Sequence, residues 1–191
     1  RSPNELKSGT VLVVGGGNSG AQIAFELAKD RYVTLATNHS LNFLPLRLLG
    51  QSIFKWLDIA GVLHAGINTR VGKWFSRRKD PVFGYELKKL LNKKKIILKP
   101  KVTRVIGSQV SFGDGSSAHF ENIVWATGFK PSYGWINIDG VIGIEGKLIH
   151  QRGVSPIQGL YFIGLPWQFS RSSALVCGVG RDAKYLCSII Y

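Results

Sequence analysis

The stretch that most constrains the fold of this chain lies at residues 10–28. It begins with the apolar, β-branched run Thr10–Val14 and passes into a glycine-dense turn, Gly15–Gly20. Alanines then recur every three or four residues, which places them on one face of a helix. A strand, a tight turn and a helix in direct succession indicate a βα unit of a parallel α/β sheet.

The glycines of this turn have the G-x-G-x-x-G spacing, with Gly15, Gly17 and Gly20 at the fixed positions. The first permits the tight turn, the second lets a pyrophosphate approach the backbone, and the third lets the helix lie close to the strand. The helix start offers free N–H groups and the positive end of its dipole to phosphates. A second β-like run, Tyr32–Ala36, follows at the expected distance. We therefore predict a dinucleotide site; a tight βα turn without a ligand is the alternative.

The end of the second strand bears on which dinucleotide is bound. In NAD-specific folds an acidic residue about 20 positions after the glycines binds the ribose 2′-hydroxyl. This sequence has no Asp or Glu between Arg31 and Trp56, and the strand ends in Thr37, Asn38 and His39. Because a carboxylate would repel a 2′-phosphate, its absence favours NADP over NAD. Thr37 and Asn38 could donate hydrogen bonds, and His39 could add positive charge when protonated; otherwise these are ordinary loop residues.

The later part of the chain changes its hydrophobic period from helical to alternating. The pattern predicts helices at 45–59, 69–79 and 84–93 and a buried strand at 96–98. From Lys101 the period is two, and Gly113-Asp114-Gly115-Ser116 is a strong hairpin signal. The run 118–126 then forms the last parallel strand. We predict an α/β fold, with a Rossmann-like parallel sheet and an inserted antiparallel β-meander.

The formal net charge of +14 is concentrated in one segment, residues 70–104. This segment has thirteen Lys or Arg residues against two acids, Asp80 and Glu86. Such a basic block is typical of protein surfaces that bind nucleic acid or an acidic membrane, and equally of solvated helix faces. No nucleic-acid-binding motif accompanies it, so we expect no nucleic-acid partner, and we expect the lysines of 88–95 to face solvent.

Other sequence features bear on disulfide bonds, metal binding and the cellular location of the protein. Cys177 and Cys187 have no spacing typical of a disulfide framework or a metal site. No apolar run reaches the ~18 residues of a membrane span, and we expect a cytoplasmic protein with no metal. The chain begins at Arg1 and has no methionine, so we expect a piece of a longer protein.

Three motifs in this order carry a family resemblance: the glycine loop with Asn18-Ser19, the Asp114-Gly115 hairpin, and Ala126-Thr127-Gly128-Phe129. Together they resemble the pyridine-nucleotide half of two-domain flavoproteins, most closely the flavin-containing monooxygenases. The stretches 159–167 and 172–183 are similar to the point where such chains return to the FAD domain. The resemblance implies an NAD(P)-binding domain at 8–128 and, at 129–191, a C-terminal segment of an FAD-binding domain whose N-terminal part is absent.

The resemblance also implies an activity. In the family NADPH reduces FAD, which activates oxygen to oxidise a small-molecule substrate, so we expect an oxidoreductase that is inactive as the isolated fragment. No C-x-x-C motif supports the disulfide-reductase branch. No catalytic residue is predicted. The residues implied in cofactor binding are Gly15, Gly16, Gly17, Asn18, Ser19, Gly20, Thr37, Asn38, His39, Thr127, Gly128, Trp167, Gln168 and Arg171.

The sequence departs from the family at the end of the second strand. Arginine often stands there, and Asn38 and His39 replace it, so charge for a 2′-phosphate would have to come from Arg47 or from the basic segment. The alternative function is a stand-alone dinucleotide-binding or interaction module whose basic segment docks an acidic partner.

Overall fold

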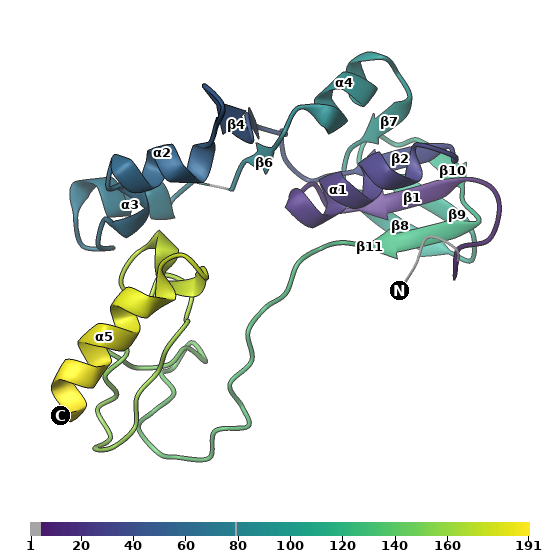
Figure 1. The fold of residues 1–191 in the computed structure, drawn as a ribbon. Coiled ribbons are helices and arrows are strands. Elements are labelled where there is room, and N and C mark those ends of the chain that lie inside the picture. Colours follow the sequence, from purple (N-terminus) through teal and green to yellow (C-terminus); the bar gives the residue numbers. More distant parts are fainter. Residues whose placement is uncertain (1–4, 79) are drawn as a thin grey trace. The chain divides into compact units, whose positions relative to one another are not determined.

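A computed structural model describes residues 5–78 and 80–191. The described residues form two compact units: unit 1 contains residues 5–50 and 80–129, and unit 2 contains residues 51–78 and 130–191. Each unit is therefore built from two separate stretches of sequence (Figure 1). Among the described residues no helix is both long and apolar enough to cross a lipid bilayer.

Unit 1 is a layered α/β unit. Its helices are α1 (Asn18–Leu27) and α4 (Glu86–Asn92). Its strands are β1 (Val11–Val14), β2 (Val33–Ala36), β3 (Phe43–Leu44), β4 (Arg47–Leu48), β6 (Val82–Phe83), β7 (Ile96–Lys99), β8 (Val102–Ile106), β9 (Gln109–Phe112), β10 (Ser117–His119) and β11 (Asn122–Trp125). The main sheet is parallel and has the order β11-β1-β2-β7.

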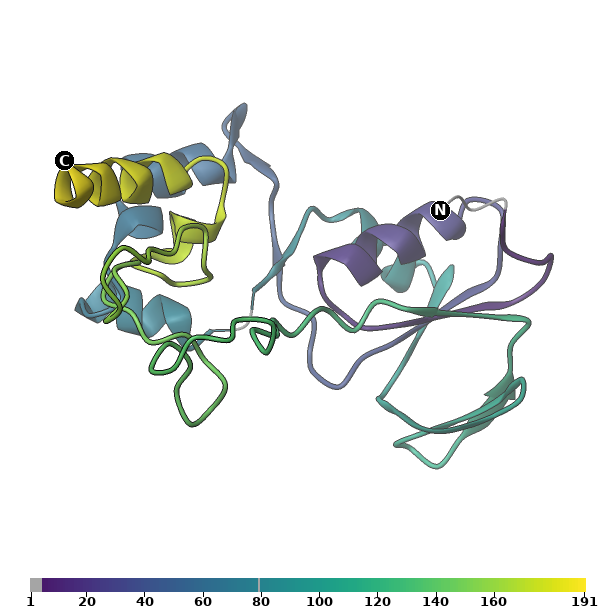
Figure 2. The same ribbon diagram turned by 90° about the horizontal axis from the view of Figure 1, so that it is seen from below.

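The two faces of this sheet have different coverings, and β1 shows why. Strand side chains alternate between faces. Val11 and Val13 pack with the buried residues of α1 and α4. Leu12 and Val14 pack with Val110 and Phe112 of β9 and with Phe120, which follows β10, on the side of the antiparallel β10-β9-β8 meander. Figures 1 and 2 both show the helices on one face and the meander on the other. The four residues of β1 are buried on both sides, so this strand is the centre of unit 1.

The predicted fold class is confirmed: a parallel sheet of Rossmann type carries an inserted antiparallel meander. The hairpin signal is also correct, since Gly115 has φ +80° at the β9–β10 turn. The lysines of 88–95 are exposed, while Leu87 is buried, as predicted.

Three details of the prediction are wrong. The helix predicted over 45–59 covers only α2 (Ile53–Ile59), because Leu49 and Gly50 have positive φ and lie between the short strands β4 and β5 (Gln51–Ser52). Of the strand predicted as buried, only Ile96 is buried, because β7 lies at the edge of the sheet. The run 118–126 is two strands, β10 and β11, in different sheets.

Unit 2 has little regular structure besides its helices. It contains α2, the 3-10 turn η2 (Val62–His64), α3 (Arg70–Ser76), η3 (Arg171–Ala174) and α5 (Val179–Ile190). η2 and α3 both contact η3, and the Ile67 amide donates to the Phe169 carbonyl at 2.7 Å. The 51–79 stretch thus packs on the C-terminal stretch, although our sequence-based division placed it in the first domain, 8–128. The basic segment is divided between the units at residue 79/80, where Lys79 lies outside the described residues.

Candidate functional site

The glycine turn between β1 and α1 is as tight as its sequence suggests. Gly15 has φ +125°, and a Cβ added there would lie 2.2 Å from the Ala126 carbonyl oxygen. A Cβ on Gly20 would lie 1.9 Å from the Gly15 carbonyl oxygen, so only glycine lets α1 approach β1 this closely. A Cβ on Gly17 would meet nothing within 4 Å, which shows that the space over the turn is open.

The start of α1 is suited to a negatively charged ligand. Gly17 is the N-cap residue, and no side-chain hydrogen bond caps the helix. The N–H groups of the first turn therefore remain for a ligand, at the positive end of the helix dipole. The side chain of Asn18 has a different role: it donates to the Pro81 carbonyl and accepts from the Phe83 amide, both at 2.9 Å. Asn18 thus offers a ligand its backbone, while its amide side chain holds the segment before α4.

The end of β2 forms a small polar turn beside the glycines. The Thr37 hydroxyl donates to the His39 carbonyl at 3.2 Å and accepts from the His39 amide at 3.3 Å. The His39 Nδ1 lies 2.9 Å from the Ser40 carbonyl oxygen, and a carbonyl can only accept, so Nδ1 carries the proton. Nε2 is then the ring nitrogen that can face a ligand, and it donates only when the imidazole is protonated.

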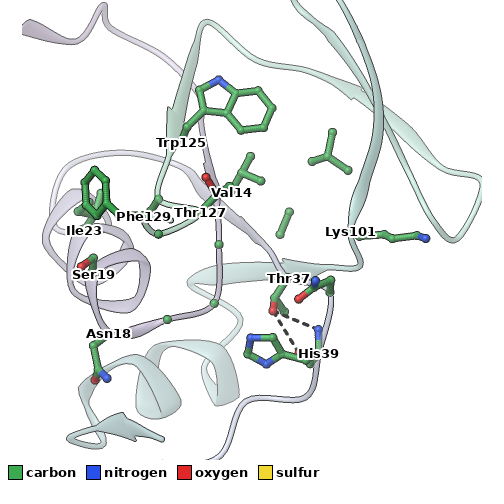
Figure 3. Close-up of a pocket in the computed structure, with 18 of the residues that line it drawn as sticks. Val14, Asn18, Ser19, Ile23, Thr37, His39, Lys101, Trp125, Thr127 and Phe129 are labelled. Atoms are coloured by element: carbon green, nitrogen blue, oxygen red, sulfur yellow. Dashed lines mark hydrogen bonds between the residues drawn. The ribbon is translucent and has the colours of Figure 1, made fainter. Parts of the chain in front are cut away.

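These features line one pocket of about 1050 Å³, at the upper end of the size typical of ligand pockets. Figure 3 shows the glycine turn with Ser19 at the α1 start, Thr37 and His39 at one end, and Trp125 with Thr127 at the other. Every lining residue belongs to unit 1. Of the residues implied in cofactor binding, those that line the pocket are Gly15, Gly16, Gly17, Asn18, Ser19, Thr37, Asn38, His39, Thr127 and Gly128.

The charged groups that line this pocket are mostly cationic. Lys101 lies between β7 and β8, and Arg104 is in β8. Asp80 is the one acidic lining residue among the described residues, and it precedes the Pro81 that Asn18 holds. Sequence reasoning gave no specific role to Lys101 or Arg104, although both lie in the basic segment.

The other residues implied in cofactor binding do not line the pocket. Gly20 is buried beneath the turn, while Trp167, Gln168 and Arg171 belong to unit 2. The Gln168 side chain is 4% exposed, and its amide accepts from Leu165 N at 3.2 Å and donates to the Phe162 carbonyl at 2.9 Å. Gln168 therefore fixes its own loop.

Unit 2 also contains a polar chain that spacing in sequence did not indicate. His64 Nδ1 lies 2.9 Å from Ser172 Oγ, and its Nε2 is hydrogen-bonded to the Asp58 carboxylate. The Ser172 hydroxyl also lies 3.0 Å from Ser170 Oγ and is 1% exposed. A serine so deeply buried cannot reach a substrate, so the arrangement joins η2 to η3 and is not a nucleophilic triad.

No metal centre is present among the described residues, where no group of three or more His, Cys, Asp or Glu side chains could hold an ion. The free cysteines Cys177 and Cys187 are exposed.

Comparison with known proteins identifies proteins that are similar to this chain in sequence. No protein-family model matches the sequence. It is 50% identical over 189 residues to an "uncharacterized oxidoreductase CzcO-like" of Geobacillus kaustophilus, and 52% identical over 186 residues to the "uncharacterized oxidoreductase CzcO" of Bacillus subtilis. These matches cover 99% and 97% of the chain and 54% of each relative. A more distant relative, 24% identical over 217 residues, is the rice indole-3-pyruvate monooxygenase YUCCA8, with 96% of the chain and 50% of the relative covered.

Solved structures show the same fold. A flavin-containing monooxygenase from Stenotrophomonas maltophilia superposes with a TM-score of 0.66 at 22% identity, covering 97% of this chain and 50% of that one. The resemblance to flavin-containing monooxygenases is confirmed. The thioredoxin reductase of T. acidophilum gives a lower TM-score, 0.56, at 16% identity over 98% of this chain and 55% of that one. The chain spans about half the length of the curated relatives that it matches.

Proposed function

We propose that this chain is the NADP(H)-binding portion of a flavin-dependent oxidoreductase of the flavin-containing monooxygenase type, acting on a small-molecule substrate in the full-length protein. The oxidoreductase names of the CzcO relatives support the general class. The observation that carries the assignment of the dinucleotide is the uncapped start of α1, which opens into a pocket lined by Lys101 and Arg104.

The residues present fit a dinucleotide. The open space above Gly17 admits a pyrophosphate, and the first-turn N–H groups of α1 would hold it. Thr37, Asn38 and His39 would lie at the adenosine ribose, because the end of the second strand has this position in dinucleotide-binding sheets. The other end of the pocket, at Trp125 and Thr127, is left for the nicotinamide.

The chain itself would bind and orient the cofactors. When bound, the nicotinamide supplies a hydride for reduction of FAD, and this chemistry belongs to the cofactors. The apolar wall made by Val14, Ile23 and Trp125 would exclude water from one side of the dinucleotide. In unit 2, Trp167 and Arg171 are the flavin contacts that the family resemblance implies, whereas the amide of Gln168 is used within its own loop.

A titration with a matched pair of variants tests the proposal. The 191-residue chain is titrated calorimetrically with NADP⁺ and with NAD⁺, and so are Ser19→Glu and Gln22→Glu. Both substitutions add one carboxylate to an exposed position of α1, but only Ser19 lines the pocket. A carboxylate at a helix start favours the helix and repels a phosphate. We expect Ser19→Glu to weaken binding of both nucleotides at least tenfold and Gln22→Glu to change it less than twofold.

Two results would contradict the proposal. If the folded chain binds neither nucleotide, or if Ser19→Glu binds as well as the parent, the pocket is not the dinucleotide site. We also expect the purified chain to lack a flavin absorbance band, because unit 1 provides one glycine loop of this kind and the described residues contain no second strand–G-x-G-x-x-G–helix sequence.

A further inference from the structure

The adenosine end of the pocket lacks the residues that usually distinguish the two nicotinamide dinucleotides. The end of β2 has neither the acidic residue typical of NAD sites nor an arginine. The Thr37 hydroxyl is engaged within its own turn, and the His39 Nδ1 is bound to the Ser40 carbonyl. These residues shape the turn but provide no permanent positive charge for a 2′-phosphate.

The neighbouring strand brings a permanent charge to the same place. β7 runs parallel to β2, with Lys99 opposite Ala36, and the Thr37 amide donates to the Lys99 carbonyl at 3.1 Å. The chain that leaves β7 therefore passes directly beside the end of β2. Lys101 is the second residue beyond Lys99, it is exposed, and it lines the pocket together with Thr37, Asn38 and His39. Figure 3 shows Lys101 near the segment of Thr37 and His39, with its ammonium turned outward, away from both.

The other cations near this point are used or lie elsewhere. The Lys99 ammonium donates to Ser116 Oγ at 2.8 Å and to Asp114 Oδ2 at 3.2 Å. Hydrogen bonds from Ser116, with a smaller effect of Lys99, lower the pKa of Asp114 to about 2. This carboxylate therefore stays charged and remains an ion-pair partner of the Lys99 ammonium. Arg47, which the sequence offered as an alternative, does not line the pocket.

The backbone of Lys101 is held in place, and its side chain is exposed. Its carbonyl accepts from the Gly113 amide at 2.9 Å, which anchors the residue to the meander. Within residues 5–78 and 80–191, no ion pair or side-chain hydrogen bond holds its ammonium. Arg104 lines the same pocket two positions into β8 and adds to the positive field.

We propose that Lys101 is the residue by which this site recognises the 2′-phosphate and so prefers NADP(H) to NAD(H). This inference rests on the proposed function. A phosphate monoester carries about −1.5 to −2 charges near neutral pH, and a lysine ammonium pairs with it as a point charge. Because the group is solvent-exposed and therefore screened by salt, we expect a preference of about tenfold.

The experiment compares adenosine ligands that differ by one phosphate. The chain is titrated with NADP⁺ and NAD⁺, and with 2′,5′-ADP and 5′-AMP, at low and high salt. The variants are Lys101→Ala, Lys101→Glu and the control Lys93→Ala, which removes an equal charge from an exposed residue outside the pocket. We expect Lys101→Ala to weaken NADP⁺ and 2′,5′-ADP about tenfold, to leave NAD⁺ and 5′-AMP unchanged, and to abolish most of the salt dependence of the preference.

The outcomes separate this inference from the proposed function. Lys101→Glu should weaken NADP⁺ further than Lys101→Ala does, and Lys93→Ala should bind all four ligands as the parent does. If the parent binds both dinucleotides and Lys101→Ala weakens them equally or not at all, this inference is wrong and the dinucleotide site stands. If the parent binds none of the four ligands, the proposed function fails and the inference fails with it.

Discussion

Replacement of single glycines in the β1–α1 turn should separate the requirements of the fold from those of the ligand. Gly17 and Gly20 are three residues apart, and both are replaced by alanine. At Gly20 the new methyl carbon would lie 1.9 Å from the Gly15 carbonyl oxygen, a backbone atom that cannot rotate away. At Gly17 it would meet no atom within 4 Å. The two variants therefore add the same methyl group, at Gly20 where backbone atoms fill the space and at Gly17 where the space is empty.

The magnitude for Gly20→Ala follows from this distance. An ordinary contact begins near 3.4 Å, so α1 and the turn would have to separate by roughly 1.5 Å. Overpacking of this kind costs about 1–3 kcal/mol or more, and the helix propensity of alanine returns at most about 1 kcal/mol. Separation would also open the contact of Ala21, Ala24 and Leu27 with β1. We expect a net loss of about 3 kcal/mol, which corresponds to a fall of Tm of more than about 10 °C.

Gly17→Ala should have the opposite profile. Alanine is a poorer N-cap than glycine, so stability should fall by less than about 1 kcal/mol. The methyl group would stand in the space over which a pyrophosphate must approach, so we expect binding of both dinucleotides to weaken at least tenfold. Thermal melting by circular dichroism and calorimetric titration measure the two quantities. If Gly20→Ala melts within about 2 °C of the parent, or Gly17→Ala binds normally, the assignment of roles within the turn is refuted.

Two further predictions concern unit 2. His64→Ala removes the link from Asp58 to the buried Ser172 hydroxyl and should lower the free energy of unfolding by about 2 kcal/mol in urea titrations. Asp58→Ala should lower it less, because the Asp58 side chain is more exposed. Equal effects of the two substitutions would contradict the link. Burial lowers the pKa of His150 below its usual 6.5, while its Nδ1 accepts from the Gly153 amide, so the neutral ring favours the fold. The stability of the parent chain should therefore decline as the pH falls below 6.5. Between about pH 7.5 and 5.5, the Tm of His150→Gln should depend less on pH than the Tm of the parent. Identical pH profiles of Tm for the two proteins would contradict this assignment.

Local sequence accounted for the features that depend on local chemistry. The glycine turn, the helix after it and the Gly115 hairpin were predictable because each depends on a few consecutive residues and their φ preferences. The error at 45–52 has a similarly local cause that periodicity cannot reveal, because Leu49 has φ +49° although leucine rarely adopts it.

Features that depend on pairing between distant segments were not predictable. Lys101 reaches the pocket only because β7 lies beside β2 in a particular register, and no pattern near residue 101 specifies that register. His64 and Ser172 are 108 residues apart, so neither residue indicates the other in the sequence. The glycine-loop part of the site was therefore accessible from sequence, whereas the cationic end required the sheet order.

The alternation of the two units along the chain has a consequence for synthesis and for dissection of the protein. During translation, residues 51–79 emerge before the C-terminal stretch on which η2 and α3 pack, and unit 1 cannot complete its sheet until β11 is made. A cut after Phe129 would leave 51–79 without its partner and expose the faces that η3 covers. To obtain unit 1 alone, residues 51–79 must be replaced by a short linker joining Gly50 to Asp80, because the boundary between the units does not follow the order of the sequence.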